Sequence, residues 1–216
     1  MRFHNREHAA HLLAEKLTTY RGQHPLVLGI PRGAVPMAKI IADALGGELD
    51  VVLVHKLGAP GNPELAIGSV DETGRVYLSE HVRELGIDDD YLEKETQAQL
   101  KTLHKRRAQY TPIRPPLDPA GRLVIVVDNG IATGASMITA LRAVRAKLPA
   151  KLIAAVAVAP AETVKRIRAE ADEVVCLYAP EDFYAVGEFF EDFSQVSDEQ
   201  AIAILRQSST KPVPAA

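Results

Sequence analysis

The chain has a single cysteine among its 216 residues, so no disulfide can form within it. It also lacks any run of about 20 consecutive apolar residues, the length that a membrane-spanning helix needs. The first residues, MRFHNREH, contain no apolar stretch of signal-peptide length. These absences predict a cytoplasmic protein with no membrane partner.

A strong charge of either sign is absent as well. The formal net charge is -3, and the basic residues are scattered along the chain instead of forming one stripe. Such a balance gives no general attraction to a polyphosphate backbone, so nucleic acid is not expected as a partner. A chain of this length is sufficient for one ordinary core and too short for two large ones, which predicts one domain.

Strand-like and helix-like segments alternate along most of the sequence. The strand-like segments are nearly continuous runs of Val, Ile and Leu, which are typical of a mostly parallel sheet covered by helices on both faces. We therefore predict an α/β fold, with a small hood and a hairpin appendage. An opening helix is expected after Asn5, strands at 26–30, 51–54, 124–127, 152–158 and 174–177, and further helices at 35–45, 135–147, 161–171 and 198–206.

The segment between the second and third of these strands is less regular. GAPGNPE, residues 58–64, contains too many Gly and Pro residues for regular structure and predicts a mobile loop. A hairpin is expected at 66–78, and a long helix from Asp88 should cover one sheet face. Glu64, Asp71 and Glu72 are expected to be solvated charges on that hairpin, with contact to a substrate as the less favoured alternative.

The segment LVIVVDNGIATGAS, Leu123–Ser136, carries the most informative chemistry. It runs from a strand through a Gly-rich turn into a helix, and ligands of a parallel sheet bind beyond the carboxyl ends of its strands. Backbone N–H groups at such a helix start, with the Thr133 and Ser136 hydroxyls, would converge on one phosphate. Ala135 stands where a P-loop needs Lys, so a nucleoside triphosphatase is not favoured. Asp128 and Asn129 precede the turn, where they can hydrogen-bond the vicinal hydroxyls of a phosphorylated ribose.

The portion VIVVDNGIATGAS resembles the motif with which type I phosphoribosyltransferases bind 5-phosphoribosyl-1-pyrophosphate (PRPP). PRG at 31–33 is similar to the pyrophosphate loop of that family, and KLGAPGNPELAIG at 56–68 resembles an uncharacterised bacterial branch of it. The resemblance implies one domain at 1–207, with a hood at about 178–195, and the terminal segment SSTKPVPAA, residues 208–216, is expected to be a disordered tail.

The resemblance also implies roles for individual residues. Asp128 and Asn129 would be the catalytic pair, with Asp128 favouring the positive charge that develops on the ribose as pyrophosphate leaves. A non-proline cis peptide is implied in the PRG turn, and Mg²⁺ would arrive chelated by the diphosphate of the substrate. The remaining assignments are Ala132, Thr133, Gly134, Ala135 and Ser136 for the 5-phosphate, Arg32, Gly33 and Lys56 for pyrophosphate, Phe183 or Tyr184 for the base, and Glu191 or Asp192 near pyrophosphate and its metal.

Two residues depart from the pattern of the family. Asn129 replaces a second acid, which makes PRPP binding a firmer expectation than catalysis, and Ala132 replaces an acid that is usual in enzymes for 6-oxopurines. The expected function is transfer of the 5-phosphoribosyl group from PRPP to a nitrogen acceptor of the nucleobase class, with release of pyrophosphate. A homodimer is the usual state in the family. A non-catalytic regulator that binds PRPP or a nucleotide, and a sugar-phosphate hydrolase, remain as alternatives.

Overall fold

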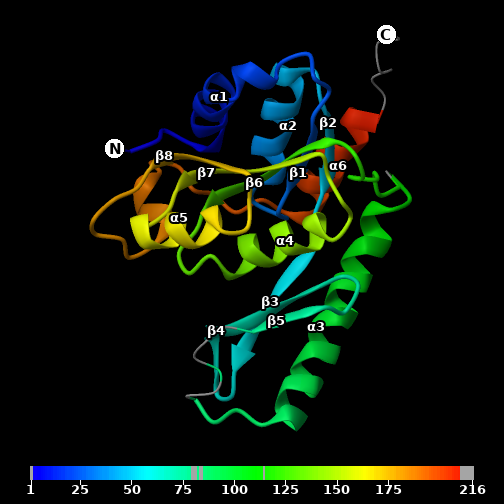
Figure 1. The fold of residues 1–216 in the computed structure, drawn as a ribbon, viewed down its shortest axis with the longest axis vertical. Helices are drawn as coiled ribbons and strands as arrows, with labels where there is room; N and C mark the ends of the chain where they lie inside the picture. Colours follow the sequence, from blue (N-terminus) through cyan, green and yellow to red (C-terminus); the bar gives the residue numbers. More distant parts are fainter. Residues whose placement is uncertain (1, 79–81, 83–84, 114, 210–216) are drawn as a thin grey trace.

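The computed structural model describes residues 2–78, 82, 85–113 and 115–209. It contains a five-stranded sheet in the order β2-β1-β6-β7-β8 and a three-stranded sheet in the order β3-β4-β5 (Figure 1). Every pair in the larger sheet is parallel, whereas both pairs in the smaller sheet are antiparallel.

The elements have the following bounds. The strands of the larger sheet are β1 Leu26–Gly29, β2 Glu48–Val51, β6 Leu123–Gly130, β7 Lys151–Val158 and β8 Glu173–Tyr178, and those of the smaller sheet are β3 Val54–Ala59, β4 Asn62–Asp71 and β5 Val76–Leu78. The helices are α1 Arg6–Lys16, α2 Val35–Leu45, α3 Asp89–Tyr110, α4 Ala135–Arg145, α5 Ala161–Arg168 and α6 Asp198–Ser209, with short 3-10 turns η1 Thr18–Tyr20 and η3 Val186–Phe189.

Helices cover both faces of the larger sheet, as predicted. α1 and α2 lie on one face, and α4 and α5 lie on the other (Figure 1). Alternate strand residues enter the two cores: Val27 and Ile125 pack on the side of α1 and α2, whereas Leu28 and Val126 pack on the side of α4 and α5. This alternation follows from the pleat of the strands and explains why they are apolar throughout.

Local signals set the ends of several helices where the sequence placed them. The Asn5 side chain accepts a hydrogen bond of 2.9 Å from His8 N and so caps α1. Gly46, with a φ of 69°, ends α2 in the left-handed conformation that favours glycine. Residues 208 and 209 still belong to α6, and the rest of the predicted tail lies outside the described residues.

Two predictions about the segment after α2 were wrong. The strand expected at 51–54 is split, because β2 ends at Val51 in the larger sheet and β3 begins at Val54 in the smaller one. The loop expected at 58–64 forms the closed end of the β3–β4 hairpin, in which Ala59 pairs with Asn62 and Gly61, with a φ of 71°, makes the turn. The turn residues lowered the strand propensity of the segment, but tertiary pairing with β4 overrides that local preference.

The smaller sheet packs between two helices, α3 and α4. α3, the long helix predicted from Asp88, packs mainly on β3 and β4, and β4 also contacts α4 (Figure 1). The acids expected to be solvated here are not alike: Asp71 is only 2% exposed, and Glu72 forms a two-pronged ion pair with Arg107 of α3. The side chain of Glu64 lies outside the described part of the chain.

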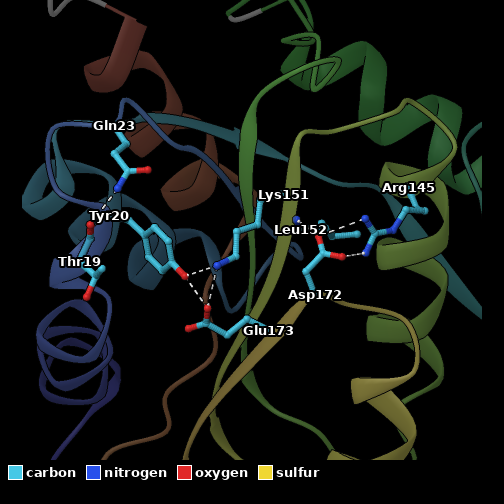
Figure 2. A network of polar contacts seen from close by, with 8 residues as sticks. All are labelled: Thr19, Tyr20, Gln23, Arg145, Lys151, Leu152, Asp172 and Glu173. Atoms are coloured by element: carbon cyan, nitrogen blue, oxygen red, sulfur yellow. Dashed lines mark hydrogen bonds and ion pairs between the residues drawn. The ribbon is translucent and has the colours of Figure 1, made fainter.

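The amino ends of β7 and β8 are joined to the turn after α1 by a polar network (Figure 2). Lys151 donates to the Tyr20 hydroxyl at 2.6 Å and to Glu173 at 3.1 Å, and Tyr20 in turn donates to Glu173. Next to it, Asp172 accepts hydrogen bonds from Arg145 and from Leu152 N. This network lies at the opposite edge of the sheet from the carboxyl ends of its strands. Among the described helices, none is both long and apolar enough to cross a membrane.

Candidate functional site

β1 and β6 lie side by side at the point where the connections of the larger sheet change direction. From β1 the chain continues to its neighbour β2 on one side, whereas β6 leads to β7 and β8 on the other. The crevice at such a switch point, beyond the carboxyl ends of the strands, is where open α/β sheets bind ligands. Here it is formed by the turn Pro31–Gly33 after β1 and by Asp128–Ser136 at the end of β6.

The two turns are packed directly against each other. A Cβ atom on Gly33 would lie 2.3 Å from Asn129 Nδ2, so only glycine permits this approach. Asn129 is 8% exposed, and its Oδ1 is buried with no partner among the described residues. The peptide between Pro31 and Arg32 is cis, as the resemblance implied.

The Gly-rich turn presents a row of unused backbone donors. Within the described residues, the N–H groups of Ala132–Ser136 have no protein acceptor, because they begin α4 with Gly134 as its N-cap at a φ of 84°. The Thr163 hydroxyl donates to Ala132 O at 2.7 Å and holds the turn from the side of α5. The turn therefore presents the arrangement of backbone donors that suits an anion at a helix N-terminus.

The PRG turn, residues 31–33, also has backbone N–H donors without acceptors among the described residues. The N–H groups of Arg32 and Gly33 likewise find no acceptor in the part of the chain that the structure describes. The Arg32 guanidinium, in contrast, extends toward α6, where Nη1 lies 3.7 Å from Asp198 Oδ2. The backbone of this turn thus keeps two N–H donors without acceptors in the described structure, while the side chain of Arg32 is paired with Asp198 of α6.

The Asp128 carboxyl lies among protein atoms at the end of β6. Its burial raises its pKa to about 7, against the opposing effects of a hydrogen bond from Asn129 N and of the Arg6 charge. Arg6, in the first turn of α1, is held by a 2.6 Å bond to Ser194 O and lies 4.0 Å from the Phe193 ring centre. Burial lowers the pKa of Arg6, whereas Asp192 and Asp128 raise it. A cation and a readily protonated acid are therefore coupled at this edge.

Lys56, a candidate for pyrophosphate binding, belongs to β3 of the smaller sheet. It lies opposite Ser69 in the β3–β4 pairing, and directly opposed residues of antiparallel strands point to the same face. The Ser69 hydroxyl donates to Ala135 O at 3.3 Å and contacts the Thr139 hydroxyl. Lys56 therefore stands on the face of the smaller sheet that meets the first turn of α4.

The segment after β8 lies over the end of β6, because a Cβ atom on Gly130 would come within 2.5 Å of Val186. Phe183 stacks on Phe189 at 5.4 Å, whereas Tyr184 is 85% exposed. The acids Glu191 and Asp192 also belong to this segment: Glu191 is bound to His4 Nδ1 at 2.9 Å, and Asp192 accepts from Ser194 N at 2.9 Å.

Comparison with known proteins decides the family. Residues 4–193 match the model of the phosphoribosyl transferase domain. The chain belongs to the phosphoribosyltransferase family.

Two relatives support this membership over nearly the whole chain. A protein of Mycobacterium tuberculosis, known from two strains and named as a putative phosphoribosyl transferase, is 39% identical over 204 residues, which are 94% of this chain and 46% of the relative. The chain thus spans about half the length of these curated relatives. The crystal structure of TT1426 from Thermus thermophilus is 48% identical, with a TM-score of 0.82, and the match covers 96% of this chain and 99% of that one.

Within this phosphoribosyltransferase fold, the structure brings together most of the residues that the sequence singled out. Asp128, Asn129 and the Ala132–Ser136 turn all stand at the carboxyl end of β6, and Gly33 of the neighbouring turn packs against Asn129. It does not bring the Arg32 guanidinium to them. Sequence reasoning missed Arg6, Thr163 and Ser69. Arg6 and Thr163 lie in the first turns of helices, whose ordinary amphipathic pattern carries no sign of a distant contact.

Proposed function

We propose that this chain binds PRPP in the crevice between β1 and β6 and transfers its phosphoribosyl group to a nitrogen acceptor of the nucleobase class. The observation that supports the proposal most is the packing of two donor-rich turns against one another, with Gly33 against Asn129. One turn suits the 5-phosphate and the other suits pyrophosphate, and PRPP carries these groups at opposite ends of its ribose. Asp128 and Asn129 directly precede the Gly-rich turn, and Asn129 packs against Gly33 of the other turn, so they are the candidates to bind the ribose hydroxyls.

Each residue group then has a defined task. The N–H groups of Ala132–Ser136 and the hydroxyls of Thr133 and Ser136 hold the 5-phosphate, and the N–H groups of Arg32 and Gly33 hold pyrophosphate. As the bond between C1 and the pyrophosphate oxygen breaks, its electron pair leaves with pyrophosphate, and the acceptor nitrogen supplies the pair for the new C1–N bond. The Asp128 carboxylate stabilises the positive charge on the ribose between these events.

The metal and the base complete the proposal. Among the described residues there is no cluster of three or more His, Cys, Asp or Glu side chains arranged to hold a metal ion. Few protein ligands suit a Mg²⁺ ion that is carried by the diphosphate of PRPP, where it would neutralise the leaving group. Tyr184, exposed in the segment above Gly130, and Phe183 are the candidates to contact the base, and Lys56 is the candidate to reach pyrophosphate from the smaller sheet.

A regulator that binds PRPP without turnover is the second candidate function. Asn129 favours it, because an amide at this position supplies one negative charge less to a cationic transition state. Its buried Oδ1, which has no partner in the described structure, can still accept a hydrogen bond from a ribose hydroxyl.

Calorimetric titration with PRPP and magnesium tests the proposal, followed by a panel of bases with pyrophosphate release as the readout. We expect binding that Ser136→Ala weakens about tenfold, since a hydrogen bond to a charged phosphate is lost. Ser208→Ala is the matched control, because this hydroxyl bonds only within α6. Base-dependent release would establish the transferase, and binding without release would favour the regulator. Equal PRPP affinity in wild type and Ser136→Ala would contradict both.

A further inference from the structure

A cavity of about 290 Å³ lies away from the PRPP crevice, at the place where the two sheets meet. It is lined by the end of β2, the β4–β5 turn, the connector after α3 and the last turn of α4. Val144 of α4 lines it, and Ser136, at the end of the Gly-rich turn, is about 12 Å away along the helix axis. The cavity is thus separate from the crevice but shares a helix with it.

The inner part of this cavity offers an unused acceptor. Asp71 lines it and is 2% exposed. Its Oδ1 accepts three hydrogen bonds, from Thr73 N at 2.8 Å, Thr73 Oγ1 at 2.6 Å and Arg75 N at 3.0 Å. Its Oδ2 has no hydrogen-bond partner among the residues that the structure describes. Because Asp71 lines the cavity, a ligand that supplies an N–H group can donate a hydrogen bond to this oxygen.

The rest of the lining is apolar along the walls and positively charged at the exposed end. The walls are apolar and include Leu28, Leu53 and Val144, all of them buried. The exposed part of the lining carries two cations, Arg75 and Lys147. The partly buried pair Glu72 and Arg107 is neutral as a unit, because Arg107 Nε and Nη2 bind both carboxylate oxygens, and Arg107 Nη1 is left without a partner among the described residues. A suitable ligand therefore has a donor at one end, a flat apolar body and an anion at the other.

We infer that this cavity is a second binding site, for a nucleoside monophosphate whose base carries an exocyclic amine. The amine donates to Asp71 Oδ2, the ring lies between the apolar walls, and the phosphate meets Arg75 and Lys147 at the exposed end. A free volume of about 290 Å³ accommodates a base, with the ribose and phosphate toward solvent. This site does not depend on what the PRPP crevice catalyses.

AMP and IMP are the probes that test the assignment, because they differ at the base position that would face Asp71. AMP presents an amine there and IMP a carbonyl oxygen. The calorimetric titration is done with PRPP and magnesium present, so that PRPP occupies the Gly-rich turn and the nucleotide cannot bind there. We expect AMP to bind about tenfold more tightly than IMP, as a hydrogen bond to a charged acceptor implies.

The variant Asp71→Asn makes the test sharp. Its Oδ1 keeps the three bonds that hold the β4–β5 turn, while an amide donor replaces the unused acceptor. The preference should reverse, with AMP weakened about tenfold and IMP strengthened. Lys147→Glu should weaken both nucleotides, whereas Lys165→Glu, an exposed charge on α5 remote from the cavity, should change neither.

A further variant covers the case in which Asp71→Asn disturbs the turn. Ala143→Trp fills the cavity from α4 without touching that turn and should abolish the second site. Equal binding of AMP and IMP, or nucleotide binding that Asp71→Asn and Ala143→Trp both leave unchanged, would overturn the assignment. Failure of the PRPP proposal would show instead as PRPP affinity that is insensitive to Ser136→Ala, so the two failures are distinguishable.

Discussion

Asp128 combines two properties that oppose one another. As an ionised carboxylate it suits the positive ribose of the proposed reaction, yet its burial raises its pKa to about 7 and favours the neutral form. Arg6 acts in the opposite direction and keeps the carboxyl closer to ionisation. The same residue therefore links the chemistry proposed for the crevice to the stability of the fold.

The raised pKa predicts how stability depends on pH. Between the ordinary value of 3.8 and about 7, the folded chain holds the Asp128 proton more tightly than the unfolded chain does. The free energy of unfolding should therefore fall as pH rises through this window. Asp128→Asn has no carboxyl to titrate at this position. Its free energy of unfolding, relative to that of wild type, should therefore rise by up to about 4 kcal/mol between pH 4 and pH 8. Urea unfolding at both pH values measures the difference, and a pH-independent difference would rule out the burial effect.

A second prediction at the scale of single residues concerns the contact between Gly33 and Asn129. Gly33→Ala places a Cβ atom where the amide of Asn129 lies, 2.3 Å from Nδ2. We expect a loss of about 1–3 kcal/mol in the free energy of unfolding, together with weaker PRPP binding. In an Asn129→Ala background the same change should cost much less, because the obstructing amide is gone. Additive losses in the double variant would mean that the two turns do not press on each other.

The turn and α4 act as one element, because the turn supplies the donors and the helix orients them. Gly134 is the residue on which both depend. Its φ of 84° disfavours any other side chain, and a Cβ atom there would come within 3.1 Å of Thr163 Cγ2. The methyl group of Thr163 and its bond to Ala132 O thus hold the turn from opposite ends.

Gly134→Ala should therefore displace the turn as well as strain it. We predict a loss of about 1–2 kcal/mol in stability and at least tenfold weaker PRPP binding. Gly22→Ala is a matched control: its φ is 79°, but a Cβ atom there meets nothing within 4 Å. It should lose similar stability and keep its PRPP affinity. Thermal unfolding and calorimetry on both variants separate the two effects, and equal PRPP affinities would refute the assignment of the turn.

At the scale of the whole molecule, the amino edge of the larger sheet carries structure and the carboxyl edge carries the candidate chemistry. The network of Tyr20, Lys151 and Glu173 joins the turn after α1 to β7 and β8 (Figure 2). The Tyr20 hydroxyl is the main cause that lowers the pKa of Glu173 and raises the pKa of Lys151. Both charged forms are thus stabilised in the neutral range.

Tyr20→Phe should lower the free energy of unfolding at pH 7 by about 0.5–1 kcal/mol, a modest value because Lys151 and Glu173 are more than one-third exposed. Since the pKa of Glu173 is lowered in the fold, its contribution is present above the ordinary value of 4.5 and is lost at lower pH. The difference between variant and wild type should shrink at pH 3. Tyr184→Phe, on an exposed ring, should show no difference at either pH. Chemical denaturation checks both.

Several elements follow from local sequence signals. The bounds of α2 were predicted to the residue, because its apolar period is regular and Gly46 ends it in a left-handed conformation. The Gly-rich turn before α4 was placed correctly for a similar reason: the glycine, the hydroxyl residues and the helix start are adjacent in the chain. The regular structure at 58–64 was missed because it depends on the pairing of β3 with β4 and on packing against α3, which no short window of sequence contains.

The sequence by itself therefore determined the strand, turn and helix that make the candidate anion site, since capping, periodicity and backbone N–H exposure act over a few residues. Only the tertiary structure decided which distant residues meet this site. Gly33 reaches Asn129 because β1 and β6 are neighbours in the sheet, and Arg6 influences Asp128 because α1 packs at the same edge. Arg32 turns to Asp198 because α6 returns to this region. Strand order and helix packing depend on burying the whole core at once, and that constraint is spread over the entire chain.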